Sequence, residues 1–173
     1  MALPCLEVKI ENPAEDGTGE ICVKGKTVML GYYKNEEETN RVMKDGWFHT
    51  GDLGKIDYRG YISITGRCKN LIVLDNGKNV YPEEIENYIM LLPYVAEVVV
   101  KGEKDENGKT VLLAEIFLNQ DKVKEMGTAP DEAQIISDIR SKTEILPMYK
   151  QVTKIRLRDT EFEKTTTKKI RRV

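Results

Sequence analysis

The first third of the chain contains short apolar stretches that are separated by glycines and polar residues. They lie at residues 20–24, 28–30 and 61–65. Short runs of β-branched and aliphatic residues between glycines are typical of antiparallel strands. One polar stretch, residues 36–43, begins with three glutamates, and negative charge favours a helix N-terminus because of the helix dipole. This pattern predicts a small antiparallel β subdomain with one short helix.

After Gly66 the predicted elements become longer and contain fewer glycines. A helix is predicted after Pro82, because proline fits the first helical turn and Ile85, Ile89 and Leu92 recur at helical spacing. This change in element length and glycine content predicts a domain boundary at Gly66, which divides the chain into residues 1–66 and 67–173.

Strands and a second helix follow. Residues 95–101 and 110–118 are rich in β-branched and aliphatic residues, and the Asn-Gly step at 107–108 favours a hairpin turn, so these strands are predicted to pair antiparallel. Residues 152–157 alternate like another strand. A helix is predicted after Pro130, and its buried side is expected to consist of Ala133, Ile136 and Ile139. The predicted fold class is therefore α+β.

Composition narrows the range of functions. The formal net charge of −2 on 173 residues does not indicate a nucleic-acid-binding protein. The three cysteines, Cys5, Cys22 and Cys68, are widely spaced and form no Cys-x-x-Cys pair, which argues against a disulfide framework or a structural zinc site. No secretory leader or apolar run long enough for a transmembrane segment is present. We therefore expect a soluble protein of the reducing cytoplasm.

Two segments contain side chains suited to binding a nucleotide. In residues 47–53 a glycine-containing turn presents Asp52, whose carboxylate can accept hydrogen bonds from both hydroxyls of a ribose. In residues 66–86, Arg67 offers a planar guanidinium that suits ribose or phosphate oxygens. Taken singly, a solvated turn aspartate is the commoner explanation of the first segment. A charged interdomain linker explains the second equally well.

The third segment, residues 162–172, is a hydroxyl-rich turn that leads into clustered cations. A lysine ammonium there could follow the negative charge that develops on a transferring phosphoryl group. By itself, a tail of this kind is more often a solvated basic terminus or a weak nucleic-acid patch.

In this order, the three segments resemble motifs of the adenylate-forming superfamily, which includes acyl-CoA synthetases, luciferases and peptide-synthetase adenylation domains. The resemblance covers nearly the whole chain. It implies that Asp52 binds the ATP ribose, that Arg67 contacts the nucleotide, and that Lys69 is the hinge between two domains. Residues 1–66 would then end a large N-terminal adenylation domain, and residues 67–173 would form the mobile C-terminal domain.

The same resemblance assigns roles to two further groups of residues. A hairpin that approaches the pantetheine arm of CoA would consist of Asn76, Gly77, Lys78 and Asn79. The tail resembles the family's Thr-x-x-Gly-Lys-Ile motif, which makes Lys169 the catalytic lysine of adenylation. Because Lys168 stands where that motif has glycine, the loop is expected to be stiffer, and Lys168 remains a rival for the catalytic role.

Lys69 and the stretch 76–86 are most similar to long-chain fatty-acid–CoA ligases. The implied reaction uses ATP, Mg²⁺ and CoA to convert a fatty acid to its acyl-CoA. The chain contains no phosphate loop of the family's kind and no segment able to form an acyl pocket, and residues 2–5 read like the inside of a longer protein. We therefore expect a C-terminal part that meets ATP or AMP, fatty acid and CoA through an N-terminal domain, has no tightly bound cofactor, and is inactive alone.

Other interpretations remain open at this point. The basic tail could make the chain a non-enzymatic module that binds RNA or an acidic partner. A regulatory domain that dimerises through its β surface is a third interpretation. His49 is interpreted as a structural turn residue, because no carboxylate or thiol partner stands at a suggestive spacing. Cys68 lies beside Arg67, which could lower its pKa.

Overall fold

The computed structural model describes residues 4–172 and divides into two compact units. The first unit comprises residues 1–71 and the second comprises residues 72–173.

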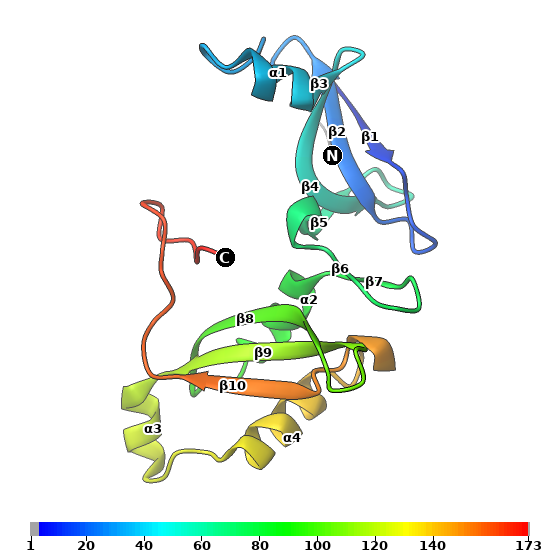
Figure 1. Cartoon of the computed structure of the whole chain (residues 1–173). Coiled ribbons are helices and arrows are strands. Elements are labelled where there is room, and N and C mark those ends of the chain that lie inside the picture. Colours follow the sequence, from blue (N-terminus) through cyan, green and yellow to red (C-terminus); the bar gives the residue numbers. More distant parts are fainter. Residues whose placement is uncertain (1–3, 173) are drawn as a thin grey trace. The chain divides into compact units, whose positions relative to one another are not determined.

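The first unit is an antiparallel sheet with the strand order β1-β2-β4-β3, and β5 pairs with β4 (Figure 1). Among its described residues, one α-helix and one 3-10 turn complete the unit. The elements are β1 (Leu6–Glu11), β2 (Gly19–Gly25), α1 (Glu36–Val42), β3 (Met43–Lys44), β4 (Trp47–Ile56), β5 (Ile62–Arg67) and η1 (Cys68–Asn70). The predicted antiparallel β structure with one short helix is confirmed.

Helix α1 begins where the sequence indicates. The Asn35 side chain caps it by accepting a hydrogen bond from the backbone N–H of Glu38, and all three residues of its first turn are glutamates. The strand predicted at residues 28–30 is wrong. Val28 instead closes a turn with Gly25, and Leu30 is 99% exposed, so this stretch has no buried face to hold it in a sheet.

The second unit contains a three-stranded sheet with the order β10-β9-β8, in which β9 is the central strand (Figure 1). Strands β8 (Val95–Lys104) and β9 (Thr110–Leu118) form the predicted hairpin, and β10 (Lys154–Arg158) lies parallel to β9. The remaining elements are β6 (Ile72–Val73), β7 (Asn79–Val80), α2 (Pro82–Ile89), α3 (Gln120–Met126), α4 (Glu132–Lys142) and η2 (Met148–Lys150). Mixed helices and sheets confirm the α+β fold class.

The core of the second unit lies where α2 and α4 pack on one face of this sheet. Alternate strand residues point into it, since successive side chains of a strand face opposite sides. Its best buried members, each at most 4% exposed, include Ile85, Ile89, Val98, Val100, Leu112, Ala114, Ile116, Ile135 and Ile139. The opposite face of the sheet carries charged residues, among them Glu97, Lys101 and Glu115.

Two details of the helices differ from the prediction. The buried side of α4 consists of Ile135 and Ile139, whereas Ala133 is exposed and Ile136 is only partly buried. Both residues at 135 and 136 are isoleucines, so the helical period alone allowed either register. Helix α3 was not predicted, because none of its residues is buried and its limits come from the Asn119 cap and the left-handed Gly127.

Within the described residues, the helices are all too short or too polar to cross a lipid bilayer.

Candidate functional site

Strand pairing brings Asp52 and Arg67 together. They are opposite partners in the β4–β5 ladder, and the Arg67 Nε donates to the Asp52 Oδ1 over 2.7 Å. Half of the Arg67 side chain (50%) and 29% of the Asp52 side chain remain exposed, so a ligand can reach both groups. The two side chains that the sequence suggested for a nucleotide therefore form one charged pair at the surface of the first unit.

Beside this pair the first unit has a pocket of about 640 Å³, a size suited to a small-molecule ligand. Arg67 and Gly51, the neighbour of Asp52, belong to its wall. The other lining residues include Tyr32, Glu38, Arg41, Phe48, His49, Thr50 and Lys69. A polar wall with two aromatic side chains and several cations suits an anionic ligand with a flat group.

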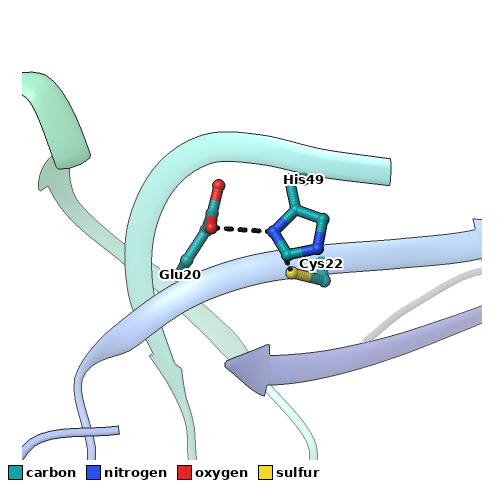
Figure 2. Close-up of side chains that lie close together, drawn as sticks. All are labelled: Glu20, Cys22 and His49. Atoms are coloured by element: carbon teal, nitrogen blue, oxygen red, sulfur yellow. Dashed lines mark hydrogen bonds and ion pairs between the residues drawn. The ribbon is translucent and has the colours of Figure 1, made fainter. Parts of the chain in front are cut away.

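Glu20 holds the turn that carries Asp52, and Figure 2 shows its contact with His49. Its Oε2 lies 2.9 Å from His49 Nδ1, and its Oε1 accepts the backbone N–H of Gly51 over 3.0 Å. Gly51 has a φ of 70°, a left-handed conformation that glycine adopts without strain. The Thr50 hydroxyl adds two contacts, since it donates to the Ile21 carbonyl and accepts the N–H of Asp52. The position of Asp52 is thus fixed by side chains of two strands.

His49 has partners that the sequence analysis missed. Besides Glu20, the Cys22 Sγ lies 3.4 Å from His49 Nδ1. Cys22 is the opposite partner of His49 in the β2–β4 ladder, and Glu20 points to the same side because it is two residues away on one strand. The statement that His49 lacks a carboxylate or thiol partner is therefore wrong. The alternation of Glu20 and Cys22 was the available signal, but only the register connects them to His49.

Glu20, Cys22 and His49 offer donor atoms that lie within 4.8 Å of one another, the spacing of a metal-ligand set. Burial, followed by the charge of Glu20, raises the pKa of the Cys22 thiol to about 11, which opposes the thiolate that metals bind. The hydrogen bonds to His49 and Gly51 already satisfy the carboxylate. We interpret the cluster as a hydrogen-bonded support for the turn.

Burial, followed by the charge of Glu20, raises the pKa of the Cys68 thiol. The expectation that Arg67 lowers it is wrong, because the lowering effect of the guanidinium is smaller than that of burial. All three cysteines are free thiols.

Lys69 lies in η1 and is exposed. The division between the two units falls after Leu71, two residues further along the chain. The hinge role of Lys69 stays a prediction.

In the second unit, residues 74–78 form the turn between β6 and β7. Gly77 has a φ of 76°, and the Asn76 side chain accepts the N–H of Lys78, so the Asn-Gly hairpin predicted here is present. Asp75 fastens this turn to β9, because its carboxylate accepts hydrogen bonds from the N–H and hydroxyl of Thr110 and from Lys104.

A second pocket of about 640 Å³ adjoins this hairpin. The hairpin forms one wall through Leu74, Asp75 and Asn76, and the β8–β9 turn and η2 form the others. Lys78 lies 4.5 Å from the ring centre of Tyr149, another lining residue.

The tail residues 163–171 form a small hairpin. Lys164 and Ile170 pair in an antiparallel bridge, and the Thr165 N–H and the Lys168 N–H close the turn by donating to the carbonyls of Lys169 and Thr165. Lys168 has a φ of 60°, a left-handed conformation that glycine adopts without strain. This explains why the motif that the tail resembles has glycine at this position. Lys169 is exposed at the end of the turn.

The geometry thus joins Asp52 and Arg67 within the first unit. It assigns the CoA-hairpin candidates, residues 76–79, and Lys169 to the second unit.

Comparison with known proteins identifies the family. Residues 84–169 match the AMP-binding enzyme C-terminal domain. The chain belongs to the AMP-binding, adenylate-forming enzymes.

Among its curated relatives is long chain acyl-CoA synthetase 1 of Arabidopsis thaliana, which is 38% identical over 162 residues. That alignment covers 91% of this chain and 24% of the relative, so the chain spans about a quarter of that protein.

Solved structures of adenylate-forming enzymes share the fold. The o-succinylbenzoate CoA synthetase of Bacillus subtilis, solved with its acyl-adenylate intermediate, is 32% identical, with a TM-score of 0.79 over 97% of this chain and 33% of the other. ATP-bound MatB of Rhodopseudomonas palustris is 33% identical, with a TM-score of 0.75 over 96% of this chain and 32% of its own. The relatives therefore include long-chain ligases and ligases for other acids.

Proposed function

We propose that this chain is the C-terminal part of an ATP-dependent acyl-CoA ligase that acts on fatty acids. In the proposed reaction, a fatty carboxylate attacks the α-phosphorus of ATP, and acyl-AMP forms as pyrophosphate leaves. The CoA thiolate then attacks the acyl carbon and AMP leaves. The observation that carries the proposal is the Asp52–Arg67 pair beside a pocket, in a chain whose second unit matches the AMP-binding C-terminal domain.

In this proposal Asp52 and Arg67 bind the ribose of the nucleotide during both half-reactions. The carboxylate accepts hydrogen bonds from the ribose hydroxyls, and the guanidinium, held by its Nε contact to Asp52, donates to the nucleotide oxygens. Their contribution is mainly positional. Lys169 stabilises negative charge that develops only while the acyl-adenylate forms. The relationship to a plant long-chain acyl-CoA synthetase supports a fatty acid as the substrate.

The first pocket does not suit a magnesium ion bound directly by protein carboxylates. Its two lining acids are already paired, Glu20 with His49 and Glu38 with Arg41, and Asp52 pairs with Arg67. Mg²⁺ commonly binds through nucleotide phosphates and water, so we assign it no ligand in this chain. ATP, the fatty acid and CoA are proposed to meet the chain through a preceding N-terminal domain.

The two half-reactions are proposed to use different segments of the second unit. Lys169 would serve adenylation, and the hairpin of Asn76, Gly77, Lys78 and Asn79 would serve thioester formation after rotation about Lys69. Substituting proline for Lys69 in a full-length protein that carries this chain is expected to slow thioester formation more than adenylation. Equal losses of both rates would contradict the hinge role.

Pyrophosphate release from ATP and palmitate tests the function itself. A full-length protein that carries this chain is expected to release pyrophosphate, and Asp52→Asn and Arg67→Gln are expected to raise the KM for ATP. The purified 173-residue chain is expected to release none. Release by the purified chain, or normal ATP use by both variants, would refute the proposal.

The alternative of a non-enzymatic binding module is less well supported. Two cations of the basic tail, Lys164 and Arg172, form ion pairs with glutamates of the second unit and are partly neutralised. Salt-dependent binding of generic oligonucleotides, lost when the last ten residues are deleted, would favour that module. The three free thiols support a reducing cytoplasm as the location of the proposed enzyme.

A further inference from the structure

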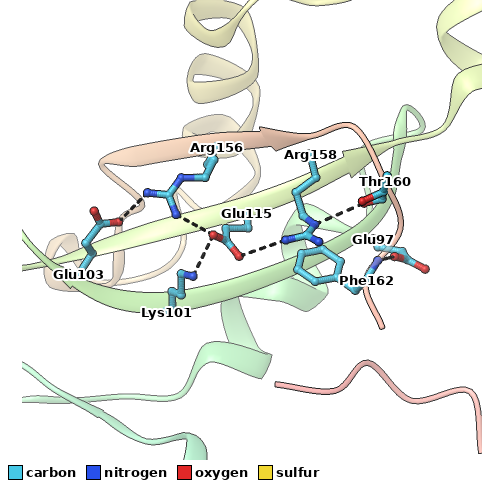
Figure 3. A network of polar contacts seen from close by, with 8 residues as sticks. All are labelled: Glu97, Lys101, Glu103, Glu115, Arg156, Arg158, Thr160 and Phe162. Atoms are coloured by element: carbon cyan, nitrogen blue, oxygen red, sulfur yellow. Dashed lines mark hydrogen bonds and ion pairs between the residues drawn. The ribbon is translucent and has the colours of Figure 1, made fainter. Parts of the chain in front are cut away.

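The tail that carries Lys169 is fastened to the sheet at its first end by Glu97 of β8 (Figure 3). The Glu97 Oε2 accepts the backbone N–H of Phe162 over 2.8 Å, and its Oε1 pairs with the Lys164 ammonium at 2.5 Å. Glu97 and Phe162 are both only 9% exposed. The guanidinium of Arg158 stacks on the Phe162 ring at 4.3 Å. A buried carboxylate therefore binds the tail just before the Lys169 hairpin.

The second end is fastened by Glu86 of α2. Its Oε2 pairs with the Arg172 guanidinium, and its Oε1 accepts the backbone N–H of Val100 over 2.7 Å. Arg172 also lies 3.6 Å from Glu83. Glu86 is 9% exposed, and this burial raises its pKa even though Val100 and Arg172 favour the charged form. The carboxylate needs a cation here, because an unpaired buried charge is strongly unfavourable.

Between these two ends the hairpin is held by its own backbone. The Arg171 N–H donates to the Glu163 carbonyl over 2.7 Å, next to the bridge of Lys164 with Ile170. Residues 163–169 and Arg171 are exposed and only Ile170 of the hairpin is partly buried, so apolar burial contributes little to its order. A short exposed hairpin of this kind is marginally stable alone. The two buried glutamates are therefore the main external contacts that can order it.

We propose that Glu97 and Glu86 are positioning residues for Lys169, which hold the two ends of the 163–171 hairpin so that Lys169 is presented from an ordered loop. This inference rests on the proposed role of Lys169 in adenylation. A charge that must follow the transition state is most effective when its position is set beforehand. Neither glutamate needs to touch the substrate for this role.

Limited proteolysis of the 173-residue chain tests the positioning without any catalysis. Trypsin cleaves after Lys168 and Lys169 only when the hairpin opens, so Glu97→Gln and Glu86→Gln are each expected to speed this cleavage roughly tenfold. Glu163→Gln is the matched control, because Glu163 is an exposed tail residue whose nearest cation, Arg171, lies 4.0 Å away. Cleavage after Lys150, which is only 7% exposed, reports general unfolding of the second unit.

Variants of the tail residues separate the loss of these ion pairs from misfolding of the second unit. Lys164→Gln and Arg172→Gln remove the same ion pairs without changing α2 or β8. They are expected to speed cleavage after Lys169 while cleavage after Lys150 stays unchanged. Cleavage at the rate of the Glu163→Gln control in all four variants would overturn the inference.

Half-reaction kinetics in a full-length protein separate positioning from general stability. Glu97→Gln is expected to slow pyrophosphate release about tenfold, with the KM for ATP and the conversion of supplied acyl-AMP to acyl-CoA unchanged. Equal loss of both half-reactions would overturn the positioning role. If Lys169→Ala retains full adenylation, the catalytic role of Lys169 fails instead, and the proteolysis result still decides whether the glutamates hold the hairpin.

Discussion

Replacing Glu20 by alanine removes the carboxylate that holds the turn before Asp52. Two hydrogen bonds are lost, one to His49 Nδ1 at 2.9 Å and one from the Gly51 N–H at 3.0 Å. A hydrogen bond to a charged group contributes about 1.5–3 kcal/mol to stability. Because the Glu20 side chain is 26% exposed, water replaces part of this, and we expect a loss of about 2 kcal/mol in total.

Trp47 makes this loss measurable in the first unit alone. It is the single tryptophan of the chain and lies in β4, two residues before His49. Urea unfolding followed by its fluorescence has an expected slope of about 1 kcal/mol per molar for a unit of this size, so the midpoint should fall by about 2 M. Far-UV circular dichroism, which the helices of the second unit dominate, should keep its own midpoint.

Glu20→Gln is the matched control. Its amide oxygen can still accept the Gly51 N–H, and His49 can present an unprotonated Nδ1 to the amide nitrogen by changing its tautomer. We expect a loss of less than about 1 kcal/mol for this variant. If Glu20→Ala unfolds at the wild-type midpoint, the carboxylate does not hold the turn and the argument is refuted.

Three further outcomes are expected. Asp75→Asn should lower the stability of the second unit at pH 7 but not near pH 2, as the urea midpoint measured at a series of acid pH values can show. Lys104 and the Thr110 N–H lower the pKa of Asp75 to about 2, against about 4 in the unfolded chain. The stability that the Asp75 carboxylate contributes is therefore lost as the pH falls through that range. Lys168→Gly should retain adenylation, because glycine suits a φ of 60°, whereas Lys169→Ala should lower it by about a hundredfold, as pyrophosphate assays of a full-length protein can show. Ile85→Ala should destabilise the second unit by about 2–5 kcal/mol in urea unfolding followed by circular dichroism, since the side chain is fully buried in the core.

Each of these outcomes has its own control. An Asp105→Asn variant changes a neighbouring turn without touching Lys104, and a pH dependence equal to that of Asp75→Asn would contradict the assignment. Loss of adenylation in Lys168→Gly would make Lys168 the catalytic candidate in place of Lys169. A wild-type midpoint for Ile85→Ala would mean that α2 does not pack as described, and Ile145→Ala, at a 78% exposed position, is the comparison.

Local pattern predicted the elements that depend on neighbouring residues. The hairpin of β8 and β9 follows from two aliphatic runs around Asn-Gly, and α2 follows from Pro82 and its buried isoleucines. The choice between Ile135 and Ile136 failed because it depends on what α4 packs against.

The residues of the candidate site were likewise predicted only in part. The motif resemblance selected Asp52 and Arg67, and the structure pairs them. Glu20 was missed, since its contact with His49 spans 29 residues and depends on the register of β2 against β4. The anchoring of the tail by Glu97 and Glu86 was also missed, because contacts 65 and 86 residues apart leave no periodic signal.

The parallel pairing of β10 with β9 has a consequence for the order of assembly. Strands β8 and β9 are neighbours in sequence and can pair early in folding. Strand β10 is separated from β9 by residues 119–153, which include α3 and α4. Closing that loop carries an entropic penalty, so β10 is expected to dock late in folding. The Lys169 hairpin follows β10 directly, and it would therefore reach its place only once the rest of the second unit has formed.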